Sequence, residues 1–414
     1  MGGRLTTLIV SVLLCFPLFA PTVSGDWGSD TWLSSVIAKE RLESGDEFGC
    51  HGYEGVETTE ENWVIASCKE YLEGLTNASR WGASPISFGI NSAIVDAQTG
   101  NSLINSGFQI VGDMVADAPA GLSIAVRNGA SLEKGVADKS LITSAEEDSL
   151  ISIHWRARID DLRIREDKDV IAWLEGQQAW FTTWGEWHHH RFSGMATSAS
   201  LNGSTVSIQS TAQSGGMASW AVPGTIMVKF DSPVLSVSDT EGHELPLISA
   251  DDRKLIVGWR AVDGGIIVTQ SPQTTVIVEL DGNPERIETT PLVTFNDLNY
   301  SVTIVGHHTT NLFQWTQDFS GTDLTFTWLI ERPSDHVVGW KLPLFAASML
   351  IAVPLSIVYL LRNDQFFGTR NQDRKSMDLR SPLPLRPSSR LSYSLLLKKV
   401  LLVDVPLVAA CQGH

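Results

Sequence analysis

The sequence contains none of the short motifs that identify the common classes of enzyme. It has no G-x-S-x-G, no Walker loop, no G-x-G-x-x-G, no C-x-x-C and no EF-hand loop. The H-E-x-x-H of zinc peptidases is also absent, because His243-Glu244 is followed by Leu-Pro-Leu. A site built from carboxylates that are distant in sequence stays open. The sequence therefore names no activity, and we favour a protein that is not an enzyme.

Basic residues are scarce over most of the chain. Residues 26–340 hold 19 Lys and Arg against 43 Asp and Glu, which gives a net charge of −24. Nucleic-acid-binding proteins need Lys and Arg to neutralise phosphates, so we exclude nucleic acid as a partner. An acidic surface of this kind favours solubility in salt or in cation-rich surroundings.

One segment lacks charge altogether. Leu342–Leu361 has 20 residues without a charged side chain, about the length that crosses a hydrocarbon core of ~30 Å. It predicts a transmembrane helix within 337–361. The following tail, 362–414, carries 9 Lys and Arg against 4 Asp, and positive charge beside a span predicts the cytoplasmic side. The tail is rich in Arg, Ser and Pro, and we expect it to be largely disordered.

The N-terminus predicts export. Residues 1–25 contain one positive charge at Arg4, an apolar run over Leu8–Ala20 and the small residues Val23-Ser24-Gly25 before a cleavage point, which is the pattern of a signal peptide. Together with the span and the basic tail, this predicts a single-pass protein of the cell membrane. Its N-terminal ectodomain would lie outside and its tail in the cytoplasm.

Cysteine is rare, and its positions are informative. Of four cysteines, Cys15 lies in the predicted signal peptide and Cys411 in the tail. An oxidising exterior favours a disulfide between the remaining two, Cys50 and Cys68. Three N-x-S sequons on the outer side are candidates for glycosylation: Asn77, Asn202 and Asn299.

The pattern of apolar and turn residues predicts a mainly β fold. Residues 26–85 are expected to form a small helical region clamped by the disulfide. Short runs of Ile, Val, Thr and Phe between turn residues follow, in a first β module with the Trp- and His-rich segment over 86–195 and a second over 196–336. Turns at this spacing favour a β-sandwich, in one or two domains, over a parallel α/β sheet.

The stretch TTWGEWHHHRF, 182–192, is the first candidate site. In a strand, alternation places Glu186, His188 and His190 on one face, where two imidazoles and a carboxylate are able to bind Zn²⁺ or another divalent ion. His307-His308 and His154-Trp155 would add to such a site if the fold brought them close. No other cofactor is expected.

The same stretch has two further interpretations. Trp180, Trp184 and Trp187 are able to form an exposed aromatic platform for a sugar or another ligand. They would also lie along one face of a helix that begins near Asp169. The third interpretation is packed core with the histidines at a solvated strand end, and the pattern favours it over the other two.

The function that the sequence favours is binding or structural. We expect a cell-surface or envelope protein whose β-rich ectodomain engages an unknown ligand or protein partner, next to the membrane. Two alternatives stay open. One is an extracellular metal-dependent enzyme or metal-handling protein that uses Glu186, His188 and His190, and the other is an accessory subunit of a membrane complex.

Overall fold

The computed structural model describes residues 36–53, 56–132, 138–156, 168–213, 220–308 and 321–332, and seven residues between 348 and 359. The chain divides into two compact units, Met1–His336 and Val337–His414. Among the described residues, no helix has both the length and the apolar composition needed to cross a membrane. The predicted signal peptide, the tail and most of the predicted span at 342–361 lie outside those residues, so the membrane topology stays a prediction.

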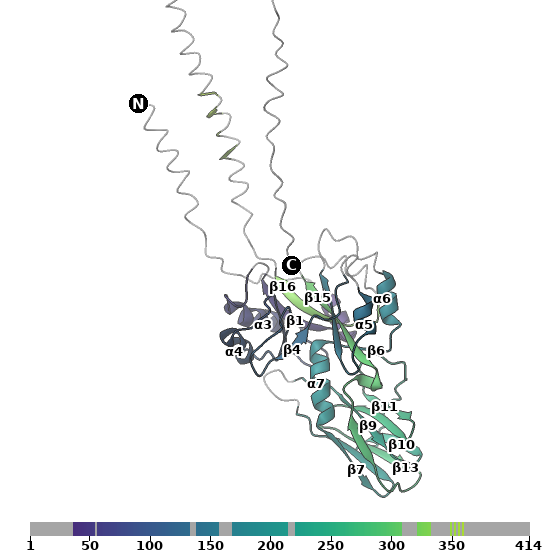
Figure 1. Cartoon of the computed structure of the whole chain (residues 1–414). Helices are drawn as coiled ribbons and strands as arrows, with labels where there is room; N and C mark the ends of the chain where they lie inside the picture. Colours follow the sequence, from purple (N-terminus) through teal and green to yellow (C-terminus); the bar gives the residue numbers. More distant parts are fainter. Residues whose placement is uncertain are drawn as a thin grey trace, which may run out of the picture. The chain divides into compact units, whose positions relative to one another are not determined.

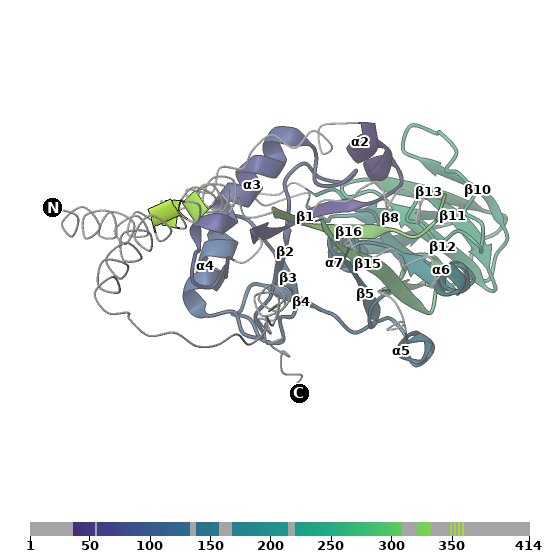
Figure 2. The ribbon, with the colours of Figure 1, turned by 90° about the horizontal axis from the view of Figure 1, so that it is seen from above.

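The first unit contains a parallel sheet of eight strands, with the order β4-β3-β2-β1-β16-β15-β5 and with β6 also pairing with β15. Figure 2 shows β1 and β16 side by side at its centre. The strands are β1 (Glu47–Tyr53), β2 (Ser87–Ile90), β3 (Ile110–Asp113), β4 (Ser123–Val126), β5 (Leu150–Arg156), β6 (Ala179–Phe181), β15 (Tyr300–His308) and β16 (Phe326–Arg332).

Helices cover both faces of this sheet. The first face carries Phe48, Phe88 and Trp328 and packs against apolar residues of five helices, which are α2 (Val36–Glu43), α3 (Trp63–Leu75), α4 (Ala97–Asn105), α5 (Lys139–Thr143) and α6 (Lys168–Glu175). The second face packs against α7 (Trp184–Met195), whose Trp184 lies in a separate apolar cluster with Leu329. Strands buried on both faces are typical of parallel sheets.

Two antiparallel sheets of four strands form a β-sandwich between β6 and β15 in the chain (Figure 1). Their facing side chains share one apolar core, which includes Val206, Ile226 and Val278. One sheet has the order β10-β13-β8-β7 and the other β11-β12-β9-β14. The strands are β7 (Thr197–Asn202), β8 (Thr205–Ser210), β9 (Gly224–Lys229), β10 (Val234–Asp239), β11 (Gly258–Val262), β12 (Gly265–Gln270), β13 (Thr275–Leu280) and β14 (Glu288–Pro291).

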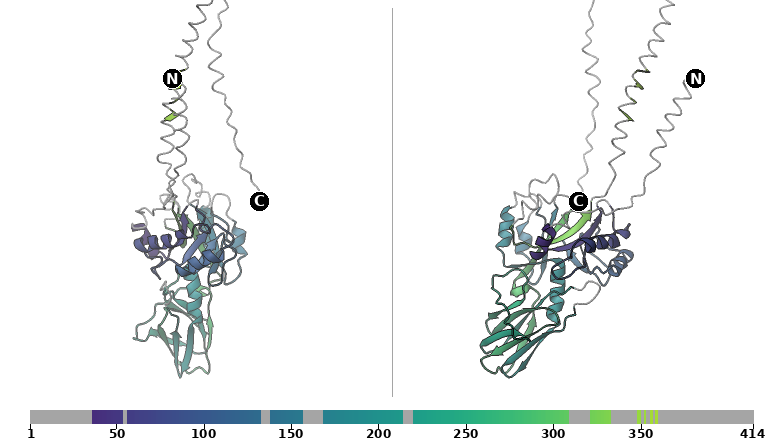
Figure 3. Two further views of the ribbon diagram at one scale, coloured as in Figure 1. Left: turned by 90° about the vertical axis from the view of Figure 1, so that its left-hand side faces the viewer. Right: turned by 180° about the vertical axis from the view of Figure 1, so that it is seen from behind.

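Helix α7 links the two parts of this unit. It packs against β9 and β7 of the sandwich (Figure 3), while its first turn is hydrogen-bonded to the parallel sheet. The backbone N–H of Trp184 donates to Thr327 Oγ1 at 3.1 Å, and that of Gly185 donates to Glu47 Oε2 at 2.8 Å. A short 3₁₀ helix, Phe295–Asp297, then leads the chain from the sandwich back into β15.

The prediction of a mainly β chain with few helices is confirmed, and so is the disulfide between Cys50 and Cys68. The prediction of a sandwich in place of a parallel sheet was wrong for half of the described strands, because eight of them form a parallel sheet. Region 26–85 is not only helical, because Cys50 lies in the central strand β1 and the bridge ties that strand to α3. The predicted domain boundaries near 85 and 195 divide the parallel sheet, because β15 and β16, which follow residue 195, lie in one sheet with β1 and β5.

A candidate metal site at the carboxyl edge of the parallel sheet

A polar cluster lies where the central strands of the parallel sheet end. In parallel strands all carboxyl ends meet at one edge, and ligands of open α/β sheets bind there at the point where the strand order reverses. The reversal lies between β1 and β16, because the chain runs from β1 outward through β2 to β4 and returns to the centre through β5, β15 and β16. The buried polar residues at this edge are His51, Asp113, His154, His307 and Glu331.

Strand alternation selects these side chains. On β16, Phe326, Trp328 and Ile330 belong to the core of the first face, whereas Leu329 belongs to that of the second, the face that α7 covers. Glu331 is in step with Leu329 and therefore extends the second face. The same alternation places His307 after Val305 on β15 and His154 after Ser152 on β5.

His51 is set into the edge by a local irregularity. The pairing of β1 with β16 slips between Cys50 and Gly52, so that His51 is the extra residue of a bulge, a device that re-aims a side chain. Gly52 has φ +91°, which favours glycine. On the neighbouring strand, a Cβ on Gly89 would lie 2.5 Å from Cδ2 of His51. The sequence of β1 and β2 thus makes room for this imidazole.

Asp113 contacts the imidazoles of His51 and His307 at their Nε2 atoms. Its Oδ2 lies 3.1 Å from Nε2 of His51 and 3.2 Å from Nε2 of His307, and its Oδ1 contacts the guanidinium of Arg127, which follows β4. Burial alone would raise the pKa of the Asp113 carboxyl, but its contacts with His307 and His51 outweigh burial and hold that pKa well below the usual range. Asp113 is therefore a carboxylate.

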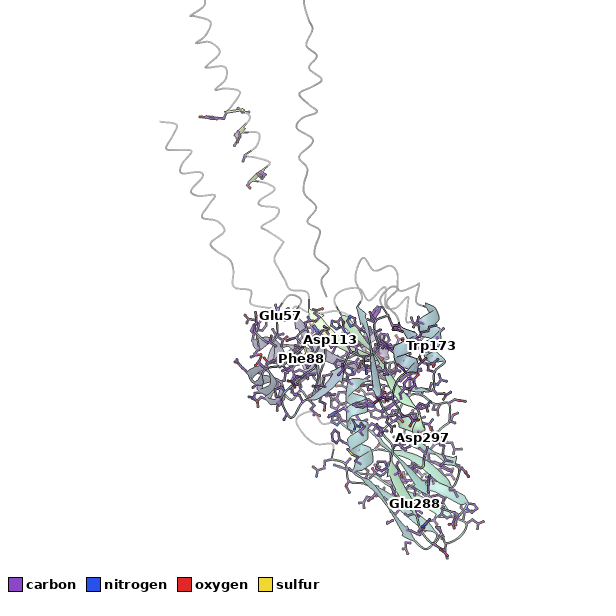
Figure 4. All side chains as sticks on the ribbon, viewed as in Figure 1. Glu57, Phe88, Asp113, Trp173, Glu288 and Asp297 are labelled. Carbon is purple, nitrogen blue, oxygen red and sulfur yellow. A yellow bond between two sulfur atoms is a disulfide. The ribbon has the colours of Figure 1, made fainter. Side chains whose placement is uncertain are left out.

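The backbone of Asp113 is unusual for a residue with a side chain. Its φ is +71°, a left-handed conformation that is uncommon for a non-glycine residue and that aspartate adopts more readily than most. Asp113 is the last residue of β3, and Figure 4 labels it in the parallel-sheet part of the unit. The turn carries its carboxylate into contact with both histidines.

Glu331 lies on the other side of the same imidazoles. Its Oε1 is 3.7 Å from Nδ1 of His51, and its Oε2 is 4.0 Å from Nδ1 of His307. A carboxylate only accepts hydrogen bonds, so Nε2 of His51 donates to Asp113, and the other ring nitrogen, Nδ1, faces Glu331. Burial lowers the pKa of His307 to about 4, which keeps that ring neutral. Nδ1 of His307 has no hydrogen-bond partner among the described residues.

The distances identify two overlapping groups of possible metal ligands within the described part of the chain. His51, His307 and Glu331 form one, and Asp113, His154 and His307 form the other; within each group the ligand atoms lie within 4.8 Å of one another. The ring of His154 packs edge-on against that of His307, with centroids 4.8 Å apart. Histidine nitrogens with carboxylate oxygens are a donor set suited to Zn²⁺ and other divalent transition metals.

The predicted site at Glu186, His188 and His190 is not brought together. The stretch is neither a strand nor part of a long helix from Asp169, because α6 and β6 precede it and Thr183 caps a new helix, accepting from the backbone N–H of Glu186 at 3.2 Å. Residues two apart on a helix point in different directions. The strand geometry on which the metal prediction depended is therefore absent.

Glu186 and His190 instead serve packing between the two parts of the unit. Glu186 is buried, with Oε1 3.4 Å from Nη2 of Arg80. Burial raises its pKa to about 7, against the opposing charge of Arg80. His190 Nε2 lies 2.8 Å from Oγ1 of Thr225 on β9, and burial lowers its pKa to about 3. These contacts occupy both side chains.

His188 and His189 lie on the outer part of α7. His189 stacks on Trp220, with ring centroids 5.8 Å apart, and His188 packs against Phe192. Both are half-buried, and burial lowers the pKa of each to about 4. Neither belongs to a metal-ligand group among the described residues.

The predicted tryptophan platform is also contradicted. Trp180 and Trp184 are 0% and 1% exposed, and the Trp184 Nε1–H donates to Oγ of Ser152 at 3.0 Å. Trp187 is half-buried, with the guanidinium of Arg191 4.8 Å above its ring. The packed-core interpretation describes Trp180 and Trp184. All three sequon asparagines, Asn77, Asn202 and Asn299, are exposed.

Sequence reasoning noticed two residues of the carboxyl-edge cluster, His154 and His307, and missed His51, Asp113 and Glu331. Each of the missed residues lies near the carboxyl end of a strand, and that position was the available signal once the strands were taken as parallel. Comparisons with protein-family models, with curated proteins and with solved structures found no significant match. The function must therefore be argued from the site.

Proposed function

We propose that this chain is a cell-surface protein, anchored by one transmembrane helix, that binds a divalent transition-metal ion at the carboxyl edge of its parallel sheet. The observation that carries the proposal is the convergence of Nδ1 of His51, Nδ1 of His307 and the carboxylate of Glu331. A neutral His307 that donates from Nε2 toward Asp113 turns an unprotonated Nδ1 toward Glu331, and this nitrogen and the carboxylate repel one another unless a cation lies between them.

The distances are close to those that a metal requires. Zn²⁺ bonds of about 2.0–2.2 Å place neighbouring tetrahedral ligands roughly 3.3–3.5 Å apart. The separations of 3.7 and 4.0 Å to Glu331 need a closure of roughly half an ångström, and all three ligand atoms lie within 4.8 Å of one another. Asp113 would then accept from the Nε2–H groups of both histidines, the outer partner that orients a ligating imidazole. Three protein ligands leave a coordination position for water or a ligand, as in catalytic zinc sites.

Several features support an extracellular location. The Cys50–Cys68 bridge suits an oxidising compartment, and the exposed sequons permit glycosylation. The signal peptide at 1–25 and the span at 342–361 are proposals from the sequence, as is the cytoplasmic tail. In this arrangement the metal site belongs to the ectodomain, where it binds an external ligand or partner.

The test is the metal content of the full chain purified in detergent. We expect about one divalent ion per chain by mass spectrometry, and zinc binding by calorimetry after chelation and dialysis. The double variant His51→Ala, His307→Ala should lose more than about 100-fold in zinc affinity, since even outer-shell changes at metal sites cost 10–100-fold.

The matched controls are histidines elsewhere. His243→Ala changes an exposed histidine near β10, and the double variant His188→Ala, His189→Ala changes the outer side of α7. Both should bind zinc like the wild type. A wild-type chain without measurable zinc affinity would sink the proposal, and so would equal loss in the α7 variant.

A further inference from the structure

Arg127 is a half-buried cation at the rim of the carboxyl-edge cluster. Its side chain is 30% exposed, whereas that of its partner Asp113 is 0% exposed. Its Nη2 contacts Asp113 Oδ1, but its Nε is buried without a hydrogen-bond partner among the described residues. The guanidinium therefore holds Asp113 with one nitrogen and keeps donor capacity at the rim of the site.

The sheet register places further basic residues at this edge. Arg156 pairs with His307 at the end of β5, and Arg332 pairs with Tyr53 at the end of β16. The surrounding chain from 26 to 340 is strongly acidic. The backbone register therefore brings two arginines to strand ends near Arg127, and arginine suits planar, bidentate binding of carboxylate and phosphate groups.

The metal changes the net charge of the cluster. A divalent ion adds two positive charges beside Asp113, Glu331 and Arg127. The loaded cluster therefore attracts an anion more strongly than the metal-free cluster does. Linkage requires the reciprocal effect, so the anion would also tighten metal binding.

We infer that the metal site takes a small ligand that carries an oxyanion, a phosphate or carboxylate group, and that Arg127 binds this group at the rim. This inference rests on the proposed metal binding and names the ligand class of the same site. The metal provides the attraction in the buried part of the site, and Arg127 provides directed hydrogen bonds from its exposed part.

The experiment measures oxyanion binding to the full zinc-loaded chain in detergent, freed of excess metal, with inorganic phosphate in one arm and acetate in the other. We expect at least one of the two to bind the loaded chain and to bind the metal-free chain at least about tenfold more weakly. In Arg127→Gln that affinity should fall at least about tenfold, the size of a lost charged hydrogen bond, measured at a zinc concentration that keeps the variant loaded. Arg127→Lys should recover part of the loss. The matched control, Arg286→Gln, removes an exposed arginine from the sandwich and should leave the oxyanion affinity unchanged.

The outcomes separate the two proposals. Zinc binding with oxyanion affinity unchanged in a folded Arg127→Gln variant overturns the inference and leaves the metal site in place. Absence of oxyanion binding in both arms overturns it as well, as does equal binding by the metal-free chain. Absence of zinc from the wild type overturns the proposed function and the inference together. The preference between the phosphate and acetate arms identifies the source of the oxyanion.

Discussion

Two clusters of histidine and carboxylate in this molecule differ in how they are encoded. On α7, Glu186, His188, His189 and His190 are adjacent in sequence, yet the helix turns them toward different neighbours. At the carboxyl edge of the parallel sheet, residues up to 280 positions apart converge within hydrogen-bonding or metal-binding distance. The comparison shows that strand alternation and sheet order bring side chains together in space. A run of histidines in the sequence does not by itself indicate a binding site.

The largest predicted effect is a loss of stability when a core residue of α7 is removed. Trp184 is fully buried and fills the space that Gly112 leaves, since a Cβ there would lie 2.4 Å from its ring. Trp184→Ala should lower the free energy of unfolding by about 3–5 kcal/mol, the usual cost of deleting a large core side chain. Trp187→Ala, at a half-buried position, should cost clearly less. Urea denaturation of both variants measures the difference, and a Trp184→Ala variant as stable as the wild type would contradict the core assignment.

The sequence predicted the antiparallel part of the fold better than the parallel part. Hairpin turns such as Asn202-Gly203 and Asp263-Gly264 are local signals, and Gly203 and Gly264 have the positive φ that such turns require. The strands β2, β3 and β4 have four residues each, and α4 between them contains Gly100. Short strands separated by a helix of low helical propensity give a sequence pattern like that of a β-sandwich. The apolar periodicity alone therefore did not reveal that the strands are parallel.

The candidate site could be predicted only in part for the same reason. His154 and His307 lie in β5 and β15, whose apolar runs are strand-like in the sequence. Asp113 was not recognisable, because its role depends on a left-handed turn at the end of β3. His51 depends on a bulge in β1, which lies in the region predicted to be helical. Knowledge of strand order, which no local pattern contains, was the missing step.

An intermediate effect concerns pH and Glu186. Its folded pKa of about 7 lies above that of an unfolded glutamate near 4.5, because burial disfavours the charge. The folded state therefore holds this proton more tightly, and stability that is present below pH 4.5 is lost as pH rises through about 7. The loss amounts to about 3 kcal/mol for a shift of this size. Glu186→Gln should remove this part of the slope in unfolding measurements between pH 4 and 8.

Glu47 contributes to the same slope, because burial also raises its pKa. Some dependence on pH should therefore remain in Glu186→Gln and disappear further in the double variant with Glu47→Gln. Glu241→Gln, at an exposed position, is the control and should keep the slope of the wild type. A Glu186→Gln slope identical to that of the wild type would show that the pKa of this carboxyl is the same in the folded and unfolded states.

The smallest effect tests whether the sheet positions His51 for the metal. An added Cβ at Gly89 would lie 2.5 Å from Cδ2 of His51 and 2.5 Å from Cδ1 of Leu329, so Gly89→Ala must displace at least one of them. Because a metal ligand moved by a fraction of an ångström binds poorly, we expect zinc affinity to fall about tenfold, or ~1.4 kcal/mol. Gly74→Ala is the control, since a Cβ there meets nothing within 4 Å. Calorimetry at a temperature where circular dichroism shows both variants folded makes the comparison. Unchanged zinc affinity in folded Gly89→Ala would mean that the position of His51 does not limit metal binding, and would move attention to the second group, Asp113, His154 and His307.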